Sequence, residues 1–155
     1  MSAAVESLGG EERLLTFEVA GDLYAIPIAG VLEVAEIGRL TCIPTLPKRM
    51  GGVINHHGDA LPVINCASLF DLEEDALGEP SVILVVAGRG DESACLGIPI
   101  DRVLGLVDGA PASMIGTRAI AERRSIDGRV ASVLDPGRLV SQARSVIESS
   151  LGRRD

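Results

Sequence analysis

An internal repeat constrains the fold more than any other feature of this sequence. The segment IPIAGVL at residues 26–32 recurs as IPIDRVL at residues 98–104. The segment GDALPVIN at residues 58–65 recurs as GRVASVLD at residues 128–135, at nearly the same spacing. Two copies so far apart do not make a solenoid. Their order, spacing and turn positions agree, which favours a duplication over a chance similarity of hydrophobic hairpins. The repeat predicts two similar β subdomains of about five strands each.

The residue types agree with a β-rich domain. Eighteen glycines and eight prolines separate short apolar runs, as turns separate strands. Hydrophobic residues make up 46% of the chain and aromatic residues only 2%, so the core must be aliphatic. The expected strands are residues 14–19, 23–28, 40–43, 52–57, 60–65, 81–87, 94–100, 103–107, 119–121 and 130–134.

The remaining segments are expected to connect or cover these strands. Residues 31–34 predict a single helical turn, and residues 44–48 an irregular loop. The acidic, turn-rich residues 69–79 form a natural boundary between the two halves. Apolar residues recur at helical spacing from residue 137 to 151, which predicts one amphipathic C-terminal helix.

The charge and the cysteines exclude several classes of function. A formal net charge of −8 argues against binding to nucleic-acid backbone or to an anionic membrane surface. Cys42, Cys66 and Cys95 have no paired spacing, so neither a disulfide scaffold nor a zinc knuckle is predicted. There is no basic region followed by an apolar run at the N-terminus and no stretch long enough to span a membrane. We expect a cytoplasmic protein without membrane insertion.

No constellation of residues predicts catalysis. His56 and His57 are the chain's two histidines, and no nucleophile motif accompanies them. With Asp59 and Cys66 they could suggest a metal site, but adjacent strand residues point to opposite faces and cannot readily bind one ion. Exposed hairpin histidines are the favoured interpretation. We therefore expect no enzyme, no cofactor and no metal.

The segment GVINHHGDALPVIN at residues 52–65 resembles the signature of CheW-like domains. In that family the signature is Gly-Val-x-Asn, then an Arg-Gly turn, then an apolar-Pro-Val-apolar-Asp strand. The flanking segments LTFEVAGDLYAI (15–26) and VLEV (31–34) and the later VLD (133–135) agree with family positions in the same order. The resemblance covers about residues 13–148.

This resemblance implies an all-β fold with short helices, in which two five-stranded SH3-like β-barrels pack side by side. The expected organisation is a disordered tail (1–12) and one domain (13–148). The domain would contain barrels at about 13–70 and 80–136 and a C-terminal helix (137–151).

The resemblance also implies a function through binding alone. CheW-like proteins are adaptors that couple a chemoreceptor to a histidine kinase in bacterial chemosensory signalling. They bind the kinase's homologous regulatory domain edge to edge between barrels, and the receptor's cytoplasmic tip in a groove between the subdomains. No kinase-binding residues can be assigned here. The positions that match the receptor-facing segment and the turn beside it are Val31, Glu33, Val34, Asn55, His57 and Gly58.

Two positions depart from the family signature. His57 replaces the signature arginine, and Asn65 replaces the usual aspartate. An imidazole lacks the permanent charge and bidentate fork of arginine, so a contact with a partner carboxylate would be weakened or replaced. A divergent chemosensory pathway, such as surface motility or gene regulation, is the preferred explanation. The alternative function is a stand-alone β-barrel regulator that binds a small ligand or a non-chemosensory partner.

Overall fold

The computed structural model describes residues 12–36, 52–64, 69, 82–87, 96–110 and 119–152. Its strands are β1 (Arg13–Val19), β2 (Asp22–Pro27), β3 (Val31–Glu36), β4 (Gly52–His56), β5 (Asp59–Val63), β6 (Val82–Val86), β7 (Leu96–Ile100), β8 (Arg102–Asp108), β9 (Ile120–Ile126) and β10 (Arg129–Leu134). The helices are the short 3-10 helix η2 (Ile28–Gly30) and α3 (Pro136–Gly152).

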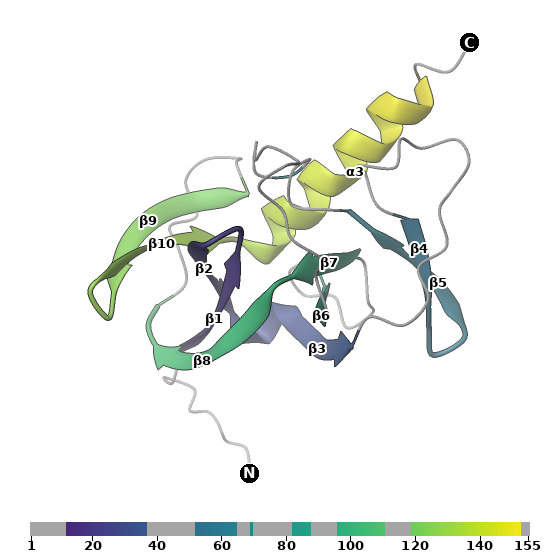
Figure 1. Ribbon diagram of the computed structural model, residues 1–155. Helices are drawn as coiled ribbons and strands as arrows, with labels where there is room; N and C mark the ends of the chain where they lie inside the picture. The colour runs from purple at the N-terminus through teal and green to yellow at the C-terminus, as the bar shows by residue number, and fades with distance from the viewer. Residues whose placement is uncertain are drawn as a thin grey trace.

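The strands form two five-stranded sheets (Figure 1). The first sheet has the order β8-β1-β2-β10-β9 and the second the order β3-β6-β7-β5-β4. The predicted fold class is confirmed: the protein is mostly β, with two five-stranded units and one C-terminal helix. Every predicted strand that falls within the described residues has a counterpart. The predicted strand 40–43, the loop 44–48 and the boundary 69–79, apart from Leu69, lie outside them.

The two sheets do not follow the expected division of the chain at 13–70 and 80–136. Strands β1 and β2 share a sheet with β8, β9 and β10, whereas β3, β4 and β5 share a sheet with β6 and β7. Each sheet therefore takes two strands from one repeat and three from the other. If β1–β5 are matched in order with β6–β10, the strand order of one sheet becomes that of the other. The two halves of the repeat are therefore structurally equivalent, and each half contributes its first two strands to the sheet that holds the last three strands of the other half.

The pairing register supports this correspondence residue by residue. The parallel pair of the first sheet places Val133 opposite Ala25, and that of the second sheet places Val63 opposite Gly97. The alignment of the two repeats matches Ala25 with Gly97 and Val63 with Val133. The two sheets are therefore equivalent in the parallel pair that joins strands of the two repeats.

Buried side chains divide into a shared core and one smaller cluster within each sheet. The shared core takes residues from both sheets and from α3, among them Phe17, Leu84 and Leu139. The smaller clusters are built around Val133 in the first sheet and around Val63 in the second. In Figure 1 the two sheets lie on either side of the molecule, and α3 lies over their junction.

Helix α3 has a well-defined start. Asp135 is its N-cap: the carboxylate accepts a hydrogen bond from the Arg138 amide at 3.0 Å, and the carbonyl accepts one from the Leu139 amide at 2.9 Å. Pro136 occupies the first helical position, where no amide hydrogen is needed. The helix therefore begins one residue before the predicted 137–151. Among the described residues, no helix has the length and apolar character needed to cross a membrane.

Candidate functional site

The segment predicted as a helical turn at residues 31–34 is instead strand β3, which pairs with β6. Its exposure alternates along the strand, with Val31 and Glu33 partly buried and Leu32 and Val34 exposed. Val31 and Val34 therefore face opposite sides and do not share the face that a helix would have given them. The single turn of helix, η2, comes just before this strand.

The hairpin turn between β4 and β5 holds the other predicted site residues. His57 and Gly58 both have positive φ angles, +53° and +91°, as a type I′ turn requires. The Asn55 side chain accepts a hydrogen bond from the Gly58 amide at 2.9 Å, which fixes the turn. Asn55, His57 and Gly58 are thus brought together as predicted from the signature.

Glu33 joins this turn to β3. Its Oε1 atom accepts a hydrogen bond from His56 Nε2 at 2.8 Å and lies 3.3 Å from His57 Nε2. Strands β3 and β4 are the two outer strands of the second sheet, so these contacts bridge its two edges. The hydrogen bonds from His56 and then His57 lower the pKa of the Glu33 carboxyl. Glu33 is therefore held as a carboxylate at neutral pH.

The expectation that both histidines are simply exposed is only half right. The His57 side chain is 74% exposed, but that of His56 is 17% exposed. The argument that adjacent histidines point apart also fails, because His57 lies in the turn with positive φ rather than in the strand. Their rings are 4.2 Å apart between centroids. His56, considered from the sequence as a metal ligand and set aside, is not among the predicted receptor-binding residues.

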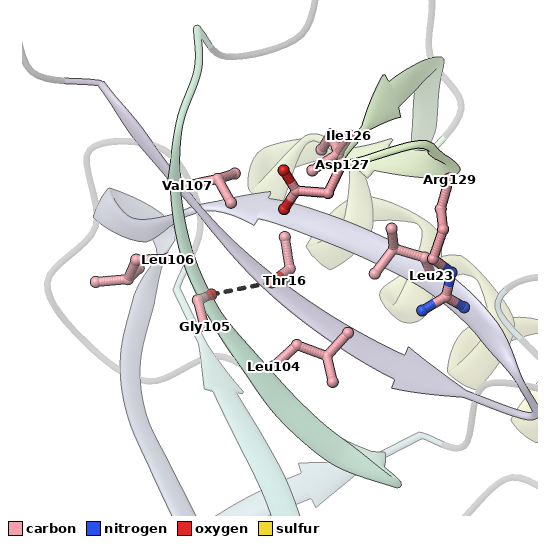
Figure 2. Close-up of a pocket in the computed structure, with 9 residues that line it drawn as sticks. All are labelled: Thr16, Leu23, Leu104, Gly105, Leu106, Val107, Ile126, Asp127 and Arg129. Atoms are coloured by element: carbon pink, nitrogen blue, oxygen red, sulfur yellow. Dashed lines mark hydrogen bonds between the residues drawn. The ribbon is translucent and has the colours of Figure 1, made fainter.

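The equivalent end of the first sheet is a shallow pocket of about 280 Å³ (Figure 2). By the alignment of the repeats, Gly105, Ile126 and Asp127 stand where Glu33, His56 and His57 stand in the second sheet. The residues that line the pocket are Thr16, Leu23, Leu104, Gly105, Leu106, Val107, Ile126, Asp127 and Arg129. Two of these residues are joined by a hydrogen bond, which the Thr16 hydroxyl donates to the Gly105 carbonyl at 3.1 Å.

Two strips of exposed apolar residues are also related by the repeat. Leu32 and Val34 on β3 are 41% and 44% exposed, and Leu104 and Leu106 on β8 are 44% and 50% exposed. The pairing register of each strand shifts at Leu32 and at Leu104, so both leucines are bulge residues. We call these pairs the β3 strip and the β8 strip. Each lies on an outer strand of its sheet. The β8 strip was not predicted as a site, although the repeat could have revealed it from Val34.

A family model described as the CheW-like domain matches residues 13–144. The chemotaxis protein CheW of Treponema pallidum is 34% identical over 97 residues, which cover 59% of this chain and 54% of that protein. The protein FrzA of Myxococcus xanthus is 34% identical over 96 residues, which cover 62% of this chain and 58% of that protein. The chain spans little more than half the length of these curated relatives.

The fold is similar to a solved structure, the scaffolding protein TtCheW from Thermoanaerobacter tengcongensis. The TM-score is 0.67, with 23% sequence identity, and the match covers 83% of this chain and 92% of the other. At this identity the likeness concerns the fold.

Proposed function

The chain belongs to the CheW-like domain family, and from this premise we propose that it is a non-enzymatic cytoplasmic adaptor. It would couple chemoreceptors to a histidine kinase in a bacterial chemosensory pathway. The names of the relatives support this proposal, since one is a chemotaxis protein and the structural neighbour is a scaffolding protein. The family match over residues 13–144 is the observation that carries it.

The receptor tip would bind at the surface formed by β3 and the β4–β5 turn. The exposed Val34, with Leu32 beside it, offers the apolar contact that a docked helix needs. Glu33, Asn55, His57 and Gly58 would form the polar rim. Val31 is half-buried and packs against the shared core, so it would support this surface from beneath rather than touch the receptor.

The kinase regulatory domain would bind the β8 strip. Two barrels that associate edge to edge need an outer strand with exposed apolar side chains. Strand β8 is an outer strand and carries the exposed Leu104 and Leu106. The β3 strip would then serve the receptor and its repeat-related counterpart the kinase. An adaptor built from a duplicated unit would thus use equivalent strips for its two partners.

Isothermal titration calorimetry of this protein with the CheW-like regulatory domain of a kinase from the same genome tests this proposal. One-to-one binding is expected. Leu106→Glu would bury a charge in the interface, so a loss of about 2 kcal/mol, roughly 30-fold in affinity, is expected. Val34→Glu is the matched control and should bind the kinase domain as the wild type does.

The outcomes separate the parts of the proposal. Binding that is lost in Val34→Glu but kept in Leu106→Glu would contradict the assignment of the two strips and leave the coupling role intact. A chain that binds no such regulatory domain would contradict the coupling role itself.

A stand-alone barrel that binds a small ligand is the alternative function. The pocket of Figure 2, about 280 Å³, is the feature that would serve it. Ligand pockets usually hold roughly 300–1,000 Å³ and enclose most of the ligand. The pocket lies below that range, and the exposed leucines 104 and 106 on its rim suit a protein contact better.

A further inference from the structure

We propose that Glu33, His56 and His57 form a binding site for one divalent transition-metal ion of the zinc class. The Glu33 carboxylate and the Nε2 atoms of both histidines would be its protein ligands. This site does not depend on the adaptor role, since it rests on the side-chain cluster alone.

The ligand atoms are already close to the spacing that such an ion needs. Each of the three residues offers one potential ligand atom, a ring nitrogen or a carboxylate oxygen, and these atoms lie within 4.8 Å of one another. With zinc–ligand bonds near 2.0–2.1 Å, tetrahedral geometry places two ligand atoms about 3.3 Å apart. The Glu33 Oε1 to His57 Nε2 distance is 3.3 Å, and the Oε1 to His56 Nε2 distance of 2.8 Å needs only a small increase. The two distances from the carboxylate oxygen are therefore within about 0.5 Å of the spacing in a tetrahedral site.

The backbone explains why two adjacent histidines can face one ion. His56 is the last residue of β4, and His57 begins the turn with a φ of +53°. That angle breaks the alternation of a strand and brings the second ring to the side of the first, with their planes at 69°. Glu33 reaches both rings from the opposite edge of the same sheet. A bound ion would cross-link β3 to the β4–β5 hairpin.

The ligand chemistry selects the class of metal. Two imidazoles and one carboxylate suit zinc, nickel or copper, whereas calcium and magnesium need a shell of oxygen atoms. Binding would replace the two Nε2–H groups that now face the carboxylate, and the histidines would carry their protons on Nδ1. His57 is 74% exposed, so the site is open to an ion and leaves a coordination position for water.

The other half of the repeat supplies an internal control. The equivalent positions hold Gly105, Ile126 and Asp127, which offer one carboxylate and no imidazole. The described part of the chain therefore has one such cluster, and one ion per chain is expected. Asp127→Asn changes the equivalent turn residue while leaving the proposed site untouched.

Titration of the untagged, metal-free protein with Zn²⁺ tests the proposal. We expect one Zn²⁺ per chain, at least tenfold weaker binding in Glu33→Gln, His56→Gln and His57→Asn, and wild-type binding in Asp127→Asn. Asn tolerates the positive φ of position 57, so His57→Asn keeps the turn. Circular dichroism would verify that each variant is folded.

Two further measurements identify the ligands in the wild-type protein, where folding is not in question. The chain has only two histidines, so nitrogen-detected NMR of the imidazoles should show both Nε2 resonances shifting on addition of one equivalent of Zn²⁺. The Co²⁺ form should lack a thiolate charge-transfer band. The proposal would be overturned by substoichiometric Zn²⁺, by unmoved histidine resonances, or by a thiolate band that shows cysteine ligation instead.

Discussion

The contact between Gly30 and Pro136 gives a stability prediction that can be worked from the structure. Gly30 ends η2, where the chain leaves the first sheet for the second, and it packs against the proline that begins α3. A Cβ atom added at Gly30 would lie within 3.0 Å of two Pro136 side-chain atoms, closer than real Cβ atoms come. The proline ring can change only its pucker, which moves Cγ but leaves Cβ in place, and the Gly30 carbonyl is held by the Ala87 amide at 3.0 Å. Gly30→Ala must therefore push helix and turn apart.

The magnitude follows from two opposing effects. Overpacking of this kind costs about 1–3 kcal/mol, and the rigidity of both partners puts this case near 3 kcal/mol. Alanine makes the unfolded chain less flexible than glycine does, which offsets about 0.4–1 kcal/mol of this cost. A net loss of about 2–3 kcal/mol is expected in the free energy of unfolding. For a domain of this size that lowers Tm by about 4–12 °C.

Urea unfolding followed by circular dichroism would measure this loss. The neighbouring exposed Ala29→Ser is the matched control and should stay within about 0.5 kcal/mol of the wild type. Pro136→Gly removes the clashing ring, so the double variant with Gly30→Ala should lose at least about 1 kcal/mol less than the sum of the two single variants. The steric argument would be refuted if Gly30→Ala unfolded with the same free energy as the Ala29→Ser control, or if the losses of the two single variants were strictly additive.

Three further predictions concern the core, the helix cap and the two ion pairs of Glu18. Ile98→Ala, fully buried in the shared core, should cost about 2–5 kcal/mol in urea unfolding, and a loss below about 1 kcal/mol would contradict its place there. Asp135→Ala should cost about 0.5–2 kcal/mol through loss of the cap of α3, and Asp135→Asn should recover most of it. Hydrogen bonds from Arg129 and then Arg102 lower the pKa of the Glu18 carboxyl below 4.5 in the folded protein. The ionised carboxylate therefore stabilises the fold above pH 4.5, and this stabilisation is lost as the pH falls through the lower pKa of the folded protein. The free energy of unfolding should therefore fall less steeply with decreasing pH in Glu18→Gln than in the wild type. An identical pH dependence in the two proteins would show that these ion pairs do not couple to folding.

Much of the fold could be predicted because the repeat and the turn residues act locally. Short apolar runs lie on both sides of Ala20-Gly21 and of Asp127-Gly128, and this pattern predicts two strands joined by a tight turn. Both residues of each pair have the positive φ angles of a type I′ turn. The apolar spacing after Pro136 gave the helix. The exchange of strands could not be predicted in this way, because equivalent strands carry equivalent patterns and can complete either sheet.

The site shows the same division between local and distant causes. The turn at Asn55, His57 and Gly58 was predicted from the signature, since its conformation depends on neighbouring residues. The helical turn predicted at residues 31–34 would place Val31 and Val34, which are three residues apart, on one face. In the structure this segment pairs with β6, which is distant in the sequence, and the hydrogen bonds to β6 make it a strand. The contact of Glu33 with His56 depends on the closure of the whole sheet, which no local pattern encodes.

The exchange of strands between the two halves has a consequence for how this architecture can arise and be divided. Two copies of a five-stranded unit, each lending its first two strands to the other, have the arrangement of a domain-swapped dimer joined into one polypeptide. Neither half of the chain contains a complete set of strands for either sheet, so the halves are interdependent like the subunits of an obligate oligomer. A single connection between β5 and β6 turns what would be a concentration-dependent association into an intramolecular one.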